Sequence, residues 1–175
     1  MKAKKIFYFF LFCSLLISMS CKQDENIIQF HPAGELASYH GCKSFTQETG
    51  ASSQVSLFHA QNQDCVEYQY YGDGVLELHH INAGFNCCPG DITSAIDIND
   101  NVIIIEESEA EQGCFCLCLF DLNYKIEGLK PGKYTIKIIE PYSSDQDEKL
   151  EFVLDLSSAT SGTHCVYRSH YPWAQ

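Results

Sequence analysis

The chain has 175 residues and a formal net charge of −12, which is enough length for one domain with its own core. Its 11 phenylalanines and 10 tyrosines favour a packed β fold over a disordered chain. Without residues 1–20, which contain three lysines, 8 basic and 23 acidic side chains remain and the net charge is −15. A surface this acidic repels nucleic acid and anionic membranes, so both are excluded as partners, whereas cations and neutral ligands such as glycans are not.

Residues 1–20 have the features of an export signal. A charged start is followed by an apolar run over residues 6–17, which is too short to cross a bilayer. The charged residues are Lys2, Lys4 and Lys5. The segment is therefore expected to direct export and then to be removed, rather than to remain as a transmembrane helix.

Cys21 follows this segment directly, after the small residue Ser20. The stretch Ile17-Ser18-Met19-Ser20-Cys21 resembles the lipobox of bacterial lipoproteins, in its relaxed Bacteroidota form. The next residues, Lys22-Gln23-Asp24-Glu25, resemble the lysine-plus-acidic signal that sends such lipoproteins to the cell surface. The resemblance implies that Cys21 carries fatty acids, including palmitate, and anchors the chain in the outer membrane, facing outward. Residues 21–34 would then be the lipidated tether.

Residues 35–175 are expected to form a single β domain, because they contain short apolar-polar alternations separated by turns. The expected strands cover 55–59, 65–71, 75–81, 93–98, 102–107, 114–126, 133–140 and 149–156. Gly72-Asp73-Gly74 and Asn99-Asp100-Asn101 are expected to close two hairpins. A short helix over Glu35–Tyr39 also fits the composition. The fold class is therefore all-β, an antiparallel sandwich of seven to nine strands.

Residues 124–136 add a more specific indication of the fold. They contain a strand, a Leu129-Lys130-Pro131-Gly132 corner and a second strand that starts at Tyr134. This arrangement resembles the last hairpin of fibronectin-like and prealbumin-like sandwiches. The resemblance implies an immunoglobulin- or prealbumin-like architecture and says nothing about function.

The central expected strand, 114–126, has an unusual first half. Its alternation places Phe120, Leu122, Tyr124 and Ile126 on one face, and the same parity turns three cysteines toward the core. Eight cysteines follow Cys21, and this even number in an exported chain favours disulfides. They are Cys42, Cys65, Cys87, Cys88, Cys114, Cys116, Cys118 and Cys165.

One economical pairing joins Cys42 to Cys65, the two cysteines of the N-terminal half. Cys87, Cys88 and Cys165 then remain for the three cysteines of the central strand. Since eight cysteines allow about 105 pairings, this scheme stays one interpretation among many.

A thiolate metal site is the alternative for the same residues. Cys114, Cys116 and Cys118, joined by His80, offer ligands for zinc or copper(I), and a thiol redox role is a related alternative. The Cys-x-Cys-x-Cys spacing lacks the turn that presents both sulfurs of a zinc finger, so disulfides are preferred. No cofactor is therefore expected.

Several other polar segments contain side chains that could bind a ligand. His79 and His80 fall on opposite faces of one strand, which predicts one surface and one packed histidine. Residues 97–101 and 145–148 offer oxygen ligands for calcium, but neither has the glycine and distant glutamate of an EF-hand loop. The C-terminal aromatic residues beside Arg168 could stack on sugar rings, although a docked tail is preferred. They are Tyr167, His170, Tyr171 and Trp173.

The chain contains no Gly-x-Ser-x-Gly, phosphate-loop or His-Glu-x-x-His motif. The sequence therefore favours a non-catalytic binding or structural module of the cell envelope, with a glycan or an envelope protein as partner. A metal or thiol redox protein is the alternative.

Overall fold

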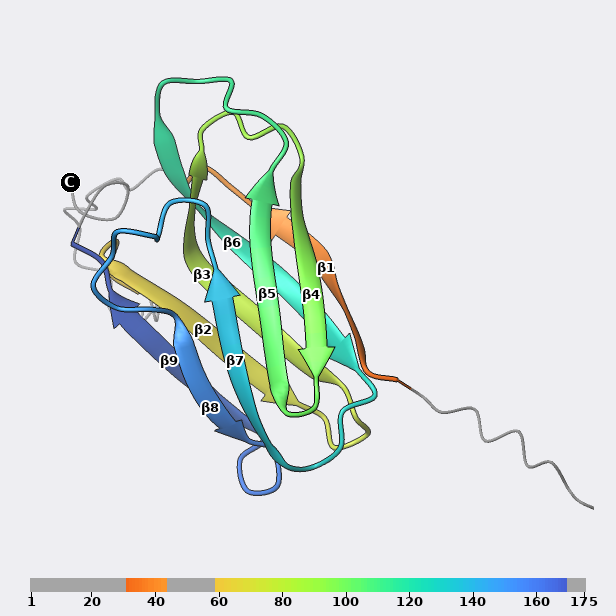
Figure 1. The fold of residues 1–175 in the computed structure, drawn as a ribbon. Coiled ribbons are helices and arrows are strands. Elements are labelled where there is room, and N and C mark those ends of the chain that lie inside the picture. Colours follow the sequence, from red (N-terminus) through yellow and green to blue (C-terminus); the bar gives the residue numbers. More distant parts are fainter. Residues whose placement is uncertain (1–30, 44–58, 170–175) are drawn as a thin grey trace, which may run out of the picture.

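The computed structural model describes residues 31–43 and 59–169, and these form nine strands and no helix. Two sheets pack face to face (Figure 1), which confirms the predicted all-β sandwich. The strands are β1 (Ala33–His40), β2 (Gln63–Tyr70), β3 (Leu76–Asn86), β4 (Ile92–Asn99), β5 (Val102–Glu109), β6 (Leu117–Glu127), β7 (Lys133–Ile139), β8 (Glu151–Asp155) and β9 (Ser161–Tyr167). Within these residues, no helix is long and apolar enough to cross a membrane.

The larger sheet has the order β1-β6-β3-β2-β9 and the smaller one the order β4-β5-β7-β8. Neighbouring strands are antiparallel except β5 and β7, which run parallel. In Figure 1, β1 and β9 lie at the two edges of the larger sheet, with β6 and β3 between them. The central position of β6 agrees with the strong alternation of its sequence.

The core lies between the sheets and is built from the alternating residues that the sequence identifies. On β6, Phe120, Leu122, Tyr124 and Ile126 are all buried. The smaller sheet meets them with a second set of buried side chains, which includes Ile103, Ile105, Ile136, Ile138, Phe152 and Leu154. Burial of such side chains from both inner faces is what stabilises a sandwich.

Both predicted hairpins are present, joining β2 to β3 and β4 to β5. In the first, Gly72 and Gly74 adopt φ values of 71° and 95°, which L-residues with a side chain rarely adopt. This explains why two glycines stand in that turn.

The edges of the fold differ from the prediction. The helix considered over Glu35–Tyr39 is wrong, because these residues belong to β1, which pairs with β6. This strand starts at Ala33, two residues before the expected start of the domain. β9 was not predicted at all, and most of the expected strand 55–59 lies outside the described residues.

The predicted hairpin over residues 124–136 is also wrong. β6 belongs to the larger sheet and β7 to the smaller one, so the Leu129–Gly132 corner crosses from sheet to sheet. The Tyr134 hydroxyl donates to the Lys130 carbonyl (3.0 Å) and accepts from its N–H (3.2 Å). A tyrosine that bonds back to the chain in this way also fixes corners in other sandwiches.

Candidate functional site

All eight cysteines of the described residues form disulfides, which confirms the predicted class of cross-link. The pairs are Cys42–Cys118, Cys65–Cys165, Cys87–Cys116 and Cys88–Cys114. The proposed pair Cys42–Cys65 is wrong. Cys42 follows β1 and lies beside β6, whereas Cys65 on β2 faces Cys165 across the β2–β9 pair.

The central strand does not carry three cysteines. β6 begins at Leu117, so only Cys118 lies on it, while Cys114 and Cys116 belong to the preceding loop, where Cys114 is half-buried and Cys116 is exposed. The thiolate metal site of Cys114, Cys116, Cys118 and His80 is therefore not assembled. The three sulfurs are bonded to other sulfurs, and His80 contacts two carboxylates instead.

The loop before β6 ends in a cross-linked tip with an aromatic side chain at its apex. Phe115 is fully exposed, at 112% of its reference area, and stands between two disulfide-bonded cysteines. Backbone hydrogen bonds run from Cys87 N–H to the Cys116 carbonyl (3.0 Å) and from Gly113 N–H to the Cys88 carbonyl (3.2 Å). We call residues 113–116, with their two disulfides, the Phe115 tip.

Asn86, at the end of β3, forms hydrogen bonds that fix the Phe115 tip. Its side-chain amide donates to the Cys114 carbonyl at 2.7 Å and its oxygen accepts the Cys114 N–H at 3.1 Å. The same oxygen accepts the Cys88 N–H at 2.8 Å. A buried asparagine therefore fixes both chains that carry the Phe115 tip.

The Phe115 tip and the entry of the chain lie at opposite ends of the sandwich. Ala33, at the start of β1, pairs with Glu127 at the end of β6. The tip comes just before Leu117, at the start of the same strand (Figure 1). Eleven residues of extended chain separate the two ends, a distance of roughly 35 Å.

A second unusual feature is a group of charged side chains buried between the sheets, which we call the buried ionic network. Its members are Asp64, His80, Glu107, Tyr124, Glu140 and Arg168. His80 is at its centre: Nδ1 lies 2.6 Å from Glu107 Oε1 and Nε2 lies 2.7 Å from Asp64 Oδ1. Since both ring nitrogens face carboxylates, both donate, and the ring is an imidazolium.

Arg168 continues the network on the side of β9. It donates to Asp64 and, at 2.8 Å, to Glu140 Oε1. Tyr124 closes the other side, because its hydroxyl donates to Glu107 at 2.6 Å. Asp64 and Tyr124 belong to the larger sheet, whereas Glu107 belongs to the smaller sheet and Glu140 follows its strand β7. The network thus joins the two sheets through hydrogen bonds.

Burial and neighbouring charge shift the ionisation of these groups. Burial alone would lower the pKa of His80, but Glu107 and Asp64 raise that pKa well above its ordinary value. Burial alone would raise the pKa of Asp64, yet His80 and Arg168 hold it below its ordinary value. Burial and the Asp64 carboxylate raise the pKa of Glu140 well above its ordinary value. Two basic side chains, His80 and Arg168, thus face three acidic ones inside the core.

This network resembles an acid-base site in composition but not in access. The side chains of His80, Asp64 and Glu140 are 0% exposed and that of Arg168 is 1% exposed. A substrate cannot reach a site that is sealed between two sheets. The network is therefore a structural element that fixes how the sheets pack.

The outer face of the larger sheet carries polar residues in two adjacent rows across β2, β3, β6 and β1. The rows are Glu67, His79, Asn123 and Ser38, and Gln69, Glu77, Lys125 and Glu35. A hollow of about 400 Å³ lies over them. Many of these groups bond to one another or to close neighbours, as Glu77 does to the Tyr71 hydroxyl (2.8 Å). The polar groups of this face therefore already have partners within the protein.

The remaining predictions have different outcomes. Within residues 31–43 and 59–169, side chains that could hold a metal gather in three places, and neither calcium candidate, 97–101 or 145–148, is among them. The histidine prediction is confirmed, since the side chain of His79 is 41% exposed and His80 is buried. Tyr167 is exposed and Arg168 is buried in the network, while residues 170–175 lie outside the described residues.

No family model, curated protein or solved structure matches this chain. Its function must therefore be argued from its own geometry.

Sequence reasoning missed most of the buried ionic network, although a signal was present. Glu107 shares the inward parity of Ile103 and Ile105 on β5. Asp64 likewise shares the parity of Val66 on β2. An acidic residue on the apolar face of a strand requires a buried partner, and this rule could have indicated both positions.

Proposed function

We propose that the protein is a non-catalytic binding module of the cell envelope, held by lipid on Cys21 and presenting the Phe115 tip to a partner. The observation that carries this proposal is the fully exposed Phe115 between two disulfides. The ring is outside the core and two disulfides hold its backbone in place, so it is available for contact with a partner. Rigid aromatic side chains are frequent binding hot spots.

The rigidity of the tip supports binding for a second reason. A flexible loop loses conformational entropy when it binds, whereas a loop already held by two disulfides and by Asn86 has little left to lose. The two disulfides therefore pre-organise Phe115 for contact.

The position of the Phe115 tip agrees with a lipid anchor at the opposite end of the sandwich. Chain entry at Ala33 and the Phe115 tip are separated by the full length of β6. A tether that leads from Cys21 to Ala33 would hold the Ala33 end toward the outer membrane and the tip away from it. The tip would then meet molecules outside the cell surface.

The ligand that we propose is a glycan or another envelope protein. A phenyl ring stacks on the apolar face of a sugar ring, and the same ring fits an apolar pocket on a protein. Glu109 and Glu111 lie close to the tip along the chain, and the mature chain is strongly acidic, so an anionic ligand is disfavoured.

The anchor can be tested by replacing Cys21 with alanine. The wild-type protein should fractionate with the outer membrane, and the Cys21→Ala variant should appear in the soluble fraction, because it has no thiol to acylate. Fractionation of cells followed by immunoblotting measures this. Equal membrane retention of both proteins would contradict the lipoprotein assignment.

The binding surface can be tested by replacing Phe115 with alanine. We expect a loss of at least about 2 kcal/mol of binding free energy, roughly thirtyfold in affinity, with an unchanged melting temperature, because the side chain is outside the core. Glycan arrays probed with the full-length protein measure the first ligand class. Photo-crosslinking in cells from a benzoylphenylalanine at position 115 measures the second.

Tyr71 provides the matched control for this test. It is also an exposed aromatic residue, at 54%, but it lies at the opposite end of the sandwich, next to the β2–β3 turn. A Tyr71→Ala variant should bind like the wild type, and a cross-linker at position 71 should capture no specific partner. If the tip gives neither a glycan signal nor a cross-link above this control, the binding proposal is wrong.

A further inference from the structure

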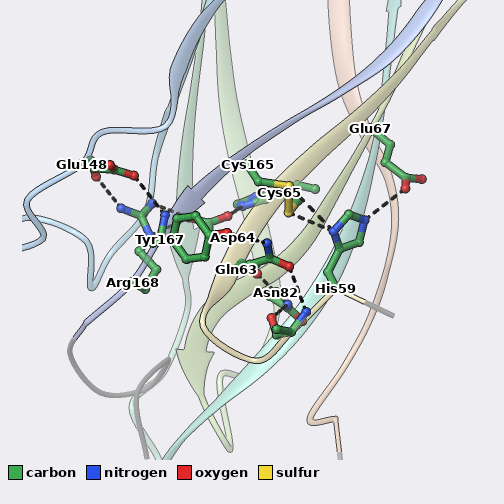
Figure 2. Close-up of a disulfide and its surroundings, with 12 residues drawn as sticks. His59, Gln63, Asp64, Cys65, Glu67, Asn82, Glu148, Cys165, Tyr167 and Arg168 are labelled. Carbon is green, nitrogen blue, oxygen red and sulfur yellow. Dashed lines mark hydrogen bonds and ion pairs between the residues drawn. A yellow bond between two sulfur atoms is a disulfide. The ribbon is translucent and has the colours of Figure 1, made fainter. Parts of the chain in front are cut away.

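The disulfide Cys65–Cys165 differs from the other three because a histidine lies against it. The two cysteines face each other across β2 and the edge strand β9. Figure 2 shows the His59 ring beside them, with Nδ1 at 3.1 Å from Cys65 Sγ and 3.7 Å from Cys165 Sγ. In the described part of the chain, no histidine nitrogen comes within hydrogen-bond distance of the other three disulfides.

Glu67 fixes the orientation of this ring. The His59 Nε2 lies 3.2 Å from Glu67 Oε1, and because a carboxylate can only accept, Nε2 donates. Nδ1 is then the nitrogen turned toward the sulfurs (Figure 2). The arrangement of carboxylate, imidazole and sulfur is the one that activates a thiol in nucleophilic enzymes.

The two sulfurs are not equivalent. Cys65 is 0% exposed, whereas Cys165 is partly exposed on the edge strand. An attacking thiolate can therefore reach Cys165, and Cys65 becomes the leaving group. Cys65 is also the sulfur nearer to His59 Nδ1, by 3.1 Å against 3.7 Å. Thiol–disulfide exchange requires one sulfur that can be attacked and another that can leave. Here Cys165 can be attacked, and Cys65 can leave with the help of His59.

We propose that Cys65–Cys165 is a thiol–disulfide exchange site whose substrate is an external dithiol. As the first thiol of the dithiol attacks Cys165 Sγ, His59 Nδ1 accepts the proton of that thiol. The bond between the two cysteines breaks, and Cys65 leaves as a thiolate that receives this proton from Nδ1. The second thiol of the dithiol then attacks the dithiol sulfur that is bound to Cys165, and its proton passes to Cys165, which is released as a thiol. In total the dithiol loses two electrons and two protons and becomes a disulfide, while the protein gains two thiols.

This site is independent of the binding role proposed above, since it lies on the outer face of the larger sheet and not at the Phe115 tip. Its residues also differ from the Cys114, Cys116 and Cys118 group in which the sequence suggested redox chemistry. Glu67 acts as a positioning residue, because it contacts His59 and not the sulfurs.

Limited treatment of the full-length oxidised protein with glutathione tests the proposal. Alkylation of the freed thiols and peptide mass spectrometry identify which disulfide opens first and which sulfur carries the glutathione. We expect Cys65–Cys165 to open first, with glutathione on Cys165 and the alkylating group on Cys65. Exposure alone predicts another order, because Cys88 and Cys116 are more exposed than either sulfur of this pair.

His59→Gln should slow the opening of Cys65–Cys165 at least about tenfold and leave the other three rates unchanged. His79→Gln is the matched control, since the His79 ring lies on the same face and 3.9 Å from the same Glu67, while the hydrogen bonds of the described residues place no His79 atom on either sulfur. Glu67→Gln should slow the same step, and Glu67→Asp should restore it. A melting curve establishes that each variant is folded. Opening in order of exposure, glutathione on Cys65, or an unchanged rate in His59→Gln would each overturn the proposal.

Discussion

Replacing His80 with glutamine should lower the free energy of unfolding by about 3–5 kcal/mol, the usual cost of removing one partner from a buried charge pair. The imidazolium contacts Glu107 at 2.6 Å and Asp64 at 2.7 Å, and all three side chains are fully buried. Glutamine is neutral, so it would leave two carboxylates facing each other without a cation between them. This loss is a large part of the 5–15 kcal/mol that typically stabilises a domain.

The neighbouring residue supplies the control for this variant. His79 lies on the same strand with its side chain 41% exposed, so His79→Gln should change the free energy of unfolding by less than about 0.5 kcal/mol. Urea unfolding of both variants and the wild type gives the comparison. Equal and small losses in the two variants would show that the buried ionic network contributes little.

The same measurement should depend on pH in a defined direction. The pKa of His80 is raised well above its ordinary 6.5, so its stabilisation is complete below about pH 6.5 and is lost as the pH rises through the raised pKa. The pKa of Glu140 is also raised, so its contribution to stability is likewise lost as the pH rises, from its ordinary 4.5 upward. The pKa of Asp64 is lowered, so its contribution changes in the opposite direction and is lost as the pH falls below 3.8.

The wild type should therefore be most stable near about pH 4, and should lose stability as the pH rises, from about 4.5 through Glu140 and from about 6.5 through His80 as well. The difference in the free energy of unfolding between the wild type and His80→Gln should become smaller as the pH rises above about 6.5. A stability curve with its maximum in the alkaline range would contradict the assigned charges of the buried ionic network.

Most strands, including the edge strands β4 and β8 of the smaller sheet, could be predicted because each buries one face and therefore has apolar residues at alternate positions. β6 is the clearest case, from Phe120 to Ile126. The edge strands β1 and β9 have few buried residues and pair on one side only, so their sequences lack this alternation. β1 forms because β6 offers its free hydrogen-bonding edge, and this is information that β1 itself does not contain.

The sites were harder to predict because they depend on pairs of distant residues. Cysteine counting predicts disulfides, but the partner of Cys65 is fixed by the pairing of β2 with an unpredicted strand, β9. The exposure of Phe115 could not be predicted either, because it depends on Cys114 and Cys116 lying in a loop and not on the strand. Nothing in the sequence distinguishes His59 and Glu67, because the contact between the His59 ring and the sulfurs exists only in the folded protein.

Removing disulfides should have effects that depend strongly on which bridge is removed. Cys42–Cys118 closes a segment of 76 residues, for which chain entropy predicts a stabilisation of about 4 kcal/mol. Cys88–Cys114 spans 26 residues but lies inside the loop already closed by Cys87–Cys116, which spans 29. While Cys87–Cys116 is intact, the inner bridge restricts only a few more residues of the unfolded chain, so it should contribute about 2 kcal/mol or less.

The double variant Cys42→Ser/Cys118→Ser should therefore melt at a clearly lower temperature than Cys88→Ser/Cys114→Ser. Complete reduction should unfold the protein, because the four contributions together exceed the net stability of a typical domain. Thermal unfolding followed by circular dichroism measures all three states, and the intact mass of the native protein should be about 8 Da below that of the all-thiol chain, two hydrogens for each bridge. A chelator should leave the melting temperature unchanged, since the sulfurs of these residues are bonded to one another and do not hold a metal. Equal melting temperatures for the two double variants would show that the long bridge stabilises the chain no more than the nested one.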